Sequence, residues 1–377
     1  MNSSLYIHIP FCVRKCSYCD FNSYENPGVS LDAYLLLLLE ELSAKAERFK
    51  VGSAPTLYFG GGTPSLLSPP QVATVVQAVR DLYGLGKDAE VTLEVNPGTV
   101  TLESLEGYLA AGINRLSIGV QSFDDSLLKV LGRIHSAEEA KDAVRMARTA
   151  GFRSIGIDLI HSLPGQTLQE WEGELQEAVA LKPDHISAYG LSVEKGTPLA
   201  AMVEAGELYL PDEEIAAAMF ELTSATLGKA GFEQYEISNF ARPGCRSRHN
   251  RVYWRRGNYL GFGAGAHSFI REGFGARWEN PPQMADYEAI VSSGRLPDAA
   301  TLSRQEAMEE FFFLGLRLME GVDLNEFAAE FGADARDMFP GAIERLSAAG
   351  LLVSDGGRLR LSSHGLILSN LVLCEFV

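Results

Sequence analysis

The chain has 377 residues, of which 46% are hydrophobic, and a formal net charge of -17 at pH 7. This composition predicts a large globular core, and the acidic balance excludes general nucleic-acid binding, because neutralising phosphates requires a basic surface. The start, MNSSLYIHIP, has no basic region or long apolar run, and no later segment reaches about eighteen uncharged apolar residues. We therefore expect a cytoplasmic protein without a transmembrane segment.

Short apolar segments recur along the first half of the chain, with helical patterns between them. The segments predict strands at 5–9, 56–59, 91–95, 115–120, 154–160 and 185–191. The intervening stretches, most of them opened by Ser, Thr, Asp or Pro as helices are, begin near Leu31, Pro70, Leu102, Ala137 and Leu168. Alternating β and α elements predict an α/β fold, either an open doubly wound sheet or a (β/α) barrel.

Polar and glycine residues at successive strand ends favour the barrel. They are the cysteines after the first strand, Gly60 to Thr63 after the second, Glu94, Gln121 and Asp158. In a (β/α) barrel these ends open onto one face, where catalytic groups gather. No G-x-G-x-x-G opens a helix after the first strand, and FGGGTPS lacks the Gly-Lys-Ser/Thr ending of a phosphate loop. We expect a partial (β/α)6 barrel.

The pattern changes after about residue 300. Helical stretches are followed by GLLVSDGGRLRLSSHG, which predicts a hairpin turning at 355–357. This α+β combination resembles a winged helix, but from residue 301 onward six Arg and no Lys stand against twelve Asp and Glu, which disfavours DNA-groove binding. The predicted domains are the barrel at 1–240, a connecting segment at 241–300 and a winged-helix-like packing or partner module at 301–377.

Three of the five cysteines, Cys12, Cys16 and Cys19, follow the first strand closely. Closed zinc sites use four ligands, usually from Cys-x-x-Cys pairs, and only Cys16 and Cys19 have that spacing, so zinc would need a distant Cys245 or His249. Iron–sulfur clusters are held by thiolates, and three thiolates on a four-iron cube leave one iron open. An open coordination position is typical of a catalytic metal. The spacing therefore favours an iron–sulfur cluster, with zinc as the alternative.

An arginine-rich stretch interrupts the acidic sequence. RPGCRSRHNRVYWRR, from Arg242 to Arg256, contains six arginines and no acidic residue. We call residues 242–256 the arginine segment. Its charge alone is equally compatible with a solvated loop and with a binding surface.

The cysteine loop CVRKCSYC resembles the cluster loop of the radical S-adenosylmethionine (SAM) superfamily. Further motifs extend the resemblance over nearly the whole chain: YIHIPFC, YFGGGTPSLL, LEVNPG, RLSIGVQSF, LGRIHS, DLIHSLPGQT and YLGFGAGAHS. They are similar to the branch that contains oxygen-independent coproporphyrinogen III oxidases and haem chaperones. The resemblance implies a [4Fe–4S] cluster on Cys12, Cys16 and Cys19, whose open iron binds SAM and whose electron cleaves SAM to a 5′-deoxyadenosyl radical.

The resemblance also implies roles for residues that match the motifs. The side chains lining the SAM site would be Tyr6 and Tyr18. The residues that bind the methionyl end of SAM would be Gly61, Gly62 and Thr63. The residues that contact its ribose and other polar groups would be Glu94, Gln121, Arg133 and Asp158.

Two features separate the oxidase branch from the chaperone branch. The oxidases carry another cysteine two residues after the third cluster ligand, where this chain has Phe21, which puts coproporphyrinogen oxidation in doubt. HNRVYW, from His249 to Trp254, resembles the His-Asn-x-x-Tyr-Trp motif that is associated with haem binding in the chaperones. Neighbouring arginines would pair with the propionates, His249 or its rival Cys245 would ligate the iron, and Trp254 would stack on the macrocycle.

The resemblance thus favours a haem chaperone that passes haem to an acceptor protein. The alternative is an enzyme that decarboxylates coproporphyrinogen III oxidatively. The expected cofactors are the [4Fe–4S] cluster, SAM and haem. The expected partners are haem or porphyrin, a haem-accepting protein and an electron donor, and not nucleic acid.

Overall fold

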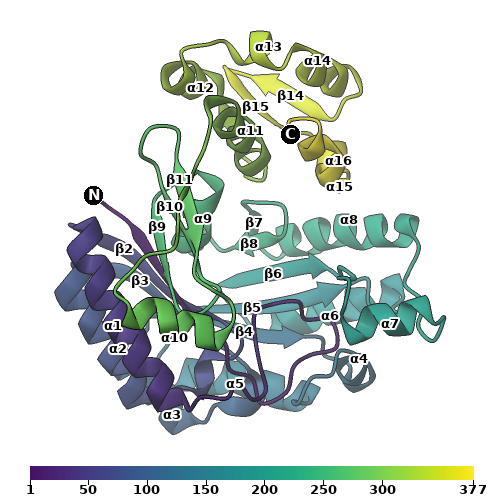
Figure 1. The fold of residues 1–377 in the computed structure, drawn as a ribbon. Helices are drawn as coiled ribbons and strands as arrows, with labels where there is room; N and C mark the ends of the chain where they lie inside the picture. The colour runs from purple at the N-terminus through teal and green to yellow at the C-terminus, as the bar shows by residue number, and fades with distance from the viewer.

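Six parallel strands, with helices after each of them, form the centre of the computed structural model, which describes residues 1–377 (Figure 1). The strands are β1 (Ser4–Ile9), β2 (Ala54–Gly61), β3 (Leu85–Val95), β4 (Arg115–Gln121), β5 (Ser154–His161) and β6 (His185–Gly190). The helices are α1 (Leu31–Phe49), α2 (Pro69–Tyr83), α3 (Leu102–Ala111), α4 (Asp125–Val130), α5 (Ala137–Thr149), α6 (Leu168–Ala180), α7 (Pro198–Glu204) and α8 (Glu213–Lys229). Two single 3₁₀ turns lie at Pro64–Leu66 and Pro97–Thr99.

Shorter strands extend this sheet on both sides. They are β7 (Glu233–Gln234) and β8 (Asn239–Ala241) beyond β6, and β9 (Tyr259–Phe262), β10 (His267–Ile270), β11 (Ala276–Glu279) and β12 (Ala300–Thr301) beyond β1. The strand order is β12-β11-β10-β9-β1-β2-β3-β4-β5-β6-β8-β7, and β1 to β6 are parallel throughout. The two terminal strands, β12 and β7, pair only with β11 and β8 and not with each other. The ring therefore does not close, and the predicted partial barrel is confirmed.

Local sequence explains where the barrel helices begin. Thr101, Ser136 and Thr167 each accept a hydrogen bond from the backbone N–H of the third helical residue, and the side chain at that position bonds back to the capping residue. These capping boxes satisfy donors that a helix start leaves unpaired. The apolar faces of the helices then cover the buried strand residues, such as Leu57 and Leu116, which are fully inaccessible to solvent.

Residues 241–300 pack as part of the barrel. Strand β9 pairs in parallel with β1, and Leu260 and Phe262 belong to the same hydrophobic core as the central strands. Helix α9 (Arg248–Trp254) lies against β2, and α10 (Met284–Ser292) lies against α1. The segment that the sequence suggests as a connection therefore contributes to the main sheet and its core.

The C-terminal residues form a separate unit, which lies above the sheet in Figure 1. Its helices are α11 (Arg304–Gly315), α12 (Leu324–Phe331), α13 (Ala335–Met338), α14 (Pro340–Ala348), α15 (Ser363–Ile367) and α16 (Ser369–Cys374). Its small sheet contains β13 (Val322–Asp323) and the predicted hairpin, β14 (Leu352–Asp355) and β15 (Arg358–Leu361). A second hydrophobic core, with Phe312, Phe327 and Phe376 at its centre, holds these elements together. None of the helices in the chain combines the length and apolar character needed to span a bilayer.

Candidate functional site

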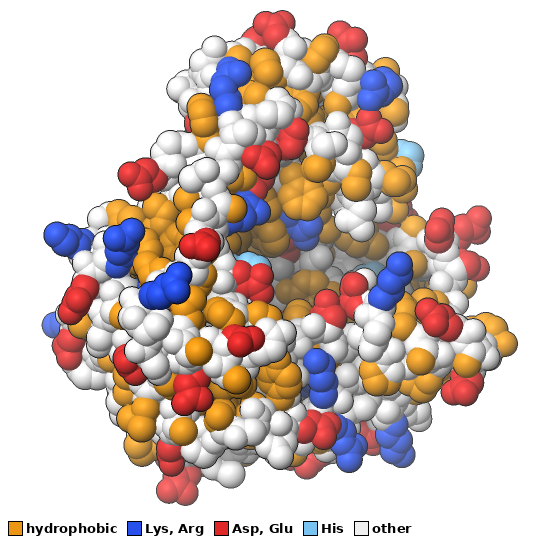
Figure 2. All heavy atoms as spheres, viewed as in Figure 1, with side chains coloured by type: hydrophobic (Ala, Val, Ile, Leu, Met, Phe, Trp, Pro, Cys, Tyr) orange, Lys and Arg blue, Asp and Glu red, His pale blue; other side chains and the backbone are white.

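A cavity of about 550 Å³ opens among the loops that follow the parallel strands. Figure 2 shows a hollow on this face of the molecule, below the C-terminal unit. The sequence-predicted residues that line the cavity are Cys12, Cys16, Tyr18, Cys19, Gly61, Gly62, Thr63, Glu94, Gln121, Arg133 and Asp158. Two predicted residues, Tyr6 and His249, do not line it. The structure thus brings nearly the whole predicted set around one space, because the carboxyl ends of parallel strands meet at one edge.

The three predicted cluster ligands face the cavity but bond to different neighbours. Cys12 Sγ accepts a hydrogen bond from Thr63 Oγ1 at 3.6 Å, and Cys19 Sγ lies 3.9 Å from the hydroxyl of Ser23. No three His, Cys, Asp or Glu side chains of the structure are gathered closely enough to hold a metal ion as they stand. All three thiols are free, and thiols around one cavity form the donor set that suits an iron–sulfur cluster.

Arg133 places a positive charge next to one of the three predicted cluster ligands, Cys16. Its Nη1 donates to Cys16 Sγ at 3.4 Å and its Nη2 donates to the carbonyl of Gly119 at 2.8 Å. Its Nε is buried without a partner. A guanidinium beside sulfur stabilises the negative charge of a ligating thiolate, and the unpaired Nε leaves one donor for a bound ligand.

Glu94 and Asp158 are two half-buried carboxyl groups that face the cavity from β3 and β5. Glu94 accepts hydrogen bonds from Tyr58 Oη at 2.8 Å and from the backbone N–H of Gly61 at 3.2 Å. Burial raises the pKa of Glu94 to about 7, Asp158 adds to the rise, and both hydrogen bonds oppose it. Burial also raises the pKa of Asp158, against the hydrogen bond that Ser117 donates at 2.9 Å. Neither carboxyl has a cationic partner within 4.0 Å, so both suit a ligand with ammonium or hydroxyl donors.

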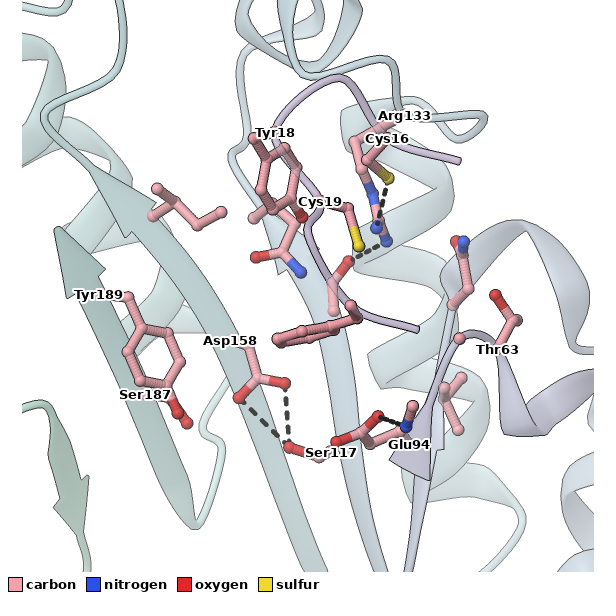
Figure 3. A pocket seen from close by; sticks show the side chains of 18 of the residues that line it. Cys16, Tyr18, Cys19, Thr63, Glu94, Ser117, Arg133, Asp158, Ser187 and Tyr189 are labelled. Carbon is pink, nitrogen blue, oxygen red and sulfur yellow. Dashed lines mark hydrogen bonds between the residues drawn. The ribbon is translucent and has the colours of Figure 1, made fainter. Parts of the chain in front are cut away.

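Figure 3 shows how these groups divide between two parts of the cavity. Cys16, Cys19 and Arg133 lie together, and Asp158 and Glu94 lie apart from them, on either side of Ser117. The register explains the second group, since Ser117 on β4 is aligned with Glu94 on β3. The cavity therefore offers thiols and a guanidinium at one part and carboxyl groups at the other.

The glycine loop after β2 brings backbone close to the cysteines. A Cβ on Gly62 would stand 2.7 Å from the carbonyl oxygen of Phe11 and 3.0 Å from Cys12 Sγ, so no side chain is tolerated there. Gly61 has a φ of +112°, which favours glycine. Its N–H points to Glu94 and that of Gly62 to the carbonyl of Ile9. Gly61 and Gly62 are therefore required because the loop passes so close to the cysteine loop.

Tyr6 lies beneath the cavity rather than at its surface. Its hydroxyl bonds to Nδ1 of His8 at 3.1 Å, and its ring stacks on Tyr58 with centroids 6.1 Å apart. Tyr58 in turn lines the cavity and holds Glu94. Tyr6 therefore contacts a lining residue instead of lining the cavity itself.

His249 is buried with both ring nitrogens occupied. Nδ1 lies 2.7 Å from Thr56 Oγ1 on β2, and Nε2 lies 2.8 Å from the hydroxyl of Tyr253. The residue is 1% exposed, and burial lowers its pKa to about 3. No ring nitrogen is free for iron in this arrangement, so the ligation expected from the sequence does not agree with the ring as it lies.

The arginine segment is largely occupied by acidic residues of the chain itself. Arg251 and Arg255 both pair with Glu320 of the C-terminal unit. Arg256 is 3% exposed and pairs with Glu330 at 2.8 Å and with Glu310 at 3.4 Å. These arginines join the C-terminal unit to the barrel, and so they are not available to haem propionates as the sequence suggests.

Trp254 is likewise engaged at this boundary. The guanidinium of Arg317, from the C-terminal unit, lies over its ring at 4.5 Å from the centroid. Its indole N–H is buried and has no partner. The stacking partner that the sequence suggests for a macrocycle is thus covered by a cation–π contact.

Sequence reasoning missed several lining residues. They include Tyr58, Arg115, Ser117, His185, Ser187, Tyr189 and Asn250. Those on β4 follow a simple rule, since residues 115, 117, 119 and 121 alternate toward the cavity as strand side chains do. Because side chains alternate along a strand, an inward-facing Gln121 predicts that residues 115, 117 and 119 also face inward. Asn250 could not be found in this way, because it reaches the cavity from α9.

Comparisons with known proteins agree with this geometry. Residues 6–178 match the radical SAM superfamily, and residues 302–368 match the HemN C-terminal domain. The chain is 36% identical to "Heme chaperone HemW" of Bacillus subtilis over 99% of both chains, and 38% identical to "Heme chaperone HemW" of Escherichia coli over 99% of this chain and 98% of the relative. The chain belongs to the HemW family of radical SAM proteins.

A solved structure extends the comparison to the whole fold. The coproporphyrinogen III oxidase HemN of Escherichia coli, described as a radical SAM enzyme, superimposes with a TM-score of 0.84 at 26% identity, over 99% of this chain and 89% of that protein. The radical SAM fold with a C-terminal domain is therefore confirmed. Membership in the superfamily implies SAM and a [4Fe–4S] cluster as cofactors.

Proposed function

We propose that this protein is a haem chaperone that binds haem and delivers it to haem-requiring acceptor proteins. The observation that carries the proposal is full-length similarity to relatives named as heme chaperones, at 36% and 38% identity. Phe21 supports it, because this residue stands where the oxidases have a cysteine. Its side chain is 61% exposed at the rim of the cavity. The oxidase of similar fold shares only 26% of its sequence with this chain.

The proposed cluster ligands are Cys12, Cys16 and Cys19, next to Arg133. The residues that would hold SAM are Tyr18, Gly61, Gly62, Thr63, Glu94, Gln121, Arg133 and Asp158. When bound, the cluster and SAM supply one-electron cleavage of a sulfonium. The chain would bind and orient them: the glycine loop, which carries no side chains, would let the polar end of the ligand approach closely, and the half-buried carboxyl groups of Glu94 and Asp158 would accept its donors.

We assign His249 and Tyr6 to the support of the site. His249 ties α9 to β2 through Thr56, and this bond fixes Asn250 at the cavity. The iron of haem is then held by another group, and the half-buried free thiol of Cys245 is the candidate within the arginine segment.

The five free cysteines agree with a reducing compartment such as the cytoplasm. The electron donor and the acceptor protein are the remaining proposed partners.

Anaerobic reconstitution followed by haem titration tests this function. We expect saturable haem binding, transfer of that haem to an apo-haem protein, and no conversion of coproporphyrinogen III to protoporphyrinogen IX with SAM and dithionite. Replacing Cys12, Cys16 and Cys19 by Ala should remove the visible absorption of the cluster. Multiple turnover of coproporphyrinogen III would restore the oxidase assignment, and zinc in place of iron and sulfide would overturn the cluster.

A further inference from the structure

Arg115 is a buried guanidinium that lines the cavity from the first position of β4. It is 3% exposed, and it shares the inward face of the strand with Ser117, Gly119 and Gln121. Gln121 is six positions beyond Arg115, so their Cα atoms lie about 20 Å apart along an extended strand. Arg115 therefore belongs to the end of the barrel opposite to the cysteine loop, where α9 contributes Asn250 to the same cavity.

No carboxylate of the chain pairs directly with this guanidinium, and Asp158 acts on it only from a longer distance. Nη1 of Arg115 donates to the hydroxyl of Ser154 at 3.4 Å, and Nε is buried without a partner. No carboxylate lies within 4.0 Å of it, whereas the equally buried Arg256 has two, from Glu310 and Glu330. Burying a charge without a counter-ion is costly. The position of Arg115 therefore calls for an anionic group supplied by a ligand.

His185, at the start of β6, adds a second unpaired donor. The hydroxyl of Tyr235 accepts a hydrogen bond from the N–H of Ser247 at 3.3 Å and lies 2.8 Å from Nε2 of His185. Because this oxygen already accepts from Ser247, we assign the hydroxyl proton to the bond with Nε2, and this assignment places the proton of the neutral ring on Nδ1. Nδ1 is buried and has no partner.

Gly156 of β5 leaves room between these two donors. A Cβ at this glycine would stand 3.4 Å from Nδ1 of His185 and 3.6 Å from Nη2 of Arg115. The register aligns Gly156 with both Ser117 and His185 on the neighbouring strands. The absence of a side chain at this inward position creates a space bordered by an N–H donor, a guanidinium and the carbonyl oxygen of Leu116, which is 3.4 Å from the same Cβ position. The N–H and the guanidinium are the groups that bind a carboxylate.

We propose that Arg115 and His185 form a carboxylate subsite that anchors a propionate of the tetrapyrrole. This inference rests on the proposed haem chaperone function. Arg251, Arg255 and Arg256 of the arginine segment are paired with Glu310, Glu320 and Glu330, and no arginine of that segment lines the cavity. Arg115 is the fully buried arginine that does line it. Arg133, a half-buried cavity arginine, contacts Cys16 and Gly119 at the opposite end.

Haem and haem dimethyl ester, in which both propionates are esterified, test the subsite by anaerobic titration. We expect wild type to bind haem roughly 10- to 100-fold more tightly than the ester, as for hydrogen bonds to charged groups. Arg115→Gln should remove most of that preference by weakening haem binding alone. Gly156→Ala should do the same by filling the space, without a clash closer than 3.4 Å. The matched control is Arg153→Gln, on an exposed arginine just before β5, which should retain the wild-type preference.

The outcomes separate this inference from the function on which it rests. If wild type binds haem and its ester equally well, the subsite is overturned and the chaperone function stands. If wild type binds no haem, both fall. If Arg115→Gln weakens SAM binding and leaves haem binding intact, the guanidinium serves SAM and the inference is wrong. Should Arg115→Gln not fold, the wild-type comparison and Gly156→Ala decide the question.

Discussion

Nη1 of Arg256 donates a hydrogen bond to Oε1 of Glu330 over 2.8 Å, and this contact joins the arginine segment to the C-terminal unit. The guanidinium also reaches the carbonyl of Phe274 at 2.7 Å and the carboxylate of Glu310 at 3.4 Å. Since Arg256 is buried, these bonds satisfy a charge that water cannot reach. The basic stretch of the sequence thus serves in part as the joint between two hydrophobic cores.

Arg256→Ala should weaken this joint strongly. The variant loses a buried guanidinium that donates to Glu330, Glu310 and the carbonyl of Phe274, while Arg271 and Arg277 still pair with the two carboxylates. We expect a loss of about 3 kcal/mol in the free energy of unfolding, as for buried hydrogen bonds to charged groups. Urea unfolding of wild type and variant measures it. The control is Arg145→Ala, which breaks exposed pairs with Glu138 and Asp142 and should cost less than about 1 kcal/mol. Equal losses of unfolding free energy in both variants would show that the buried contacts of Arg256 stabilise the protein no more than exposed ion pairs do.

The sequence was sufficient to predict the barrel, the cysteine loop and the order of polar strand ends. Apolar strands, capped helices and the glycine loop are local patterns, and local patterns determine which residues face the carboxyl ends of parallel strands. The surroundings of His249 and Arg256 are not local. His249 meets Thr56, and Arg256 meets Glu330, across long separations in sequence. An arginine-rich string cannot reveal whether its partners are ligand carboxylates or glutamates of the same chain.

Lys45 and Glu41 form a buried pair that holds α1 to the strands beside it. Lys45 Nζ lies 2.6 Å from Glu41 and donates to the carbonyl of Gly261 at 2.8 Å, while Glu41 accepts from the hydroxyl of Tyr287 on α10. Lys45→Met should lower the free energy of unfolding by about 3 to 5 kcal/mol, because Glu41 is left buried and unpaired. The double variant Lys45→Met with Glu41→Gln should recover part of the loss in the same assay. If the double variant is no more stable than Lys45→Met alone, the unpaired charge of Glu41 is not the cause of the loss.

His249 should make the protein less stable in mild acid. Its folded pKa of about 3 lies below the ordinary value of 6.5, so the unfolded chain binds the proton more readily as the pH falls below about 6.5. The stability that the neutral ring contributes is complete above that pH and is lost progressively toward pH 3. By pH 5 this amounts to about 2 kcal/mol.

His249→Gln keeps hydrogen-bonding groups but cannot titrate. Urea unfolding at pH 7.5 and pH 5, compared between this variant and wild type, isolates the contribution of His249 from those of other groups. We expect wild type to lose about 2 kcal/mol more than the variant between the two values. A loss of the same size in both proteins would mean that the ring is protonated in the folded state.

Glu94 should make SAM binding depend on pH. Its pKa of about 7 means that the carboxylate, which accepts hydrogen bonds from ligand donors, gains population between pH 6 and pH 8. Binding of SAM to the reconstituted protein should therefore tighten by up to about tenfold over this range, as measured from the change that SAM causes in the EPR signal of the reduced cluster. Glu94→Gln should bind SAM roughly tenfold or more weakly at pH 8, because it loses charged hydrogen bonds.

The amine of SAM titrates as well, so the decisive quantity is the difference between proteins rather than the pH profile of either one. Glu94→Gln should lack the part of the pH dependence that Glu94 causes. The control Glu177→Gln, on the outer surface of α6 where this residue pairs with Lys141, should follow wild type throughout. If Glu94→Gln keeps the wild-type affinity and the wild-type profile, Glu94 does not contact SAM, and this carboxyl group must be assigned to another ligand of the cavity.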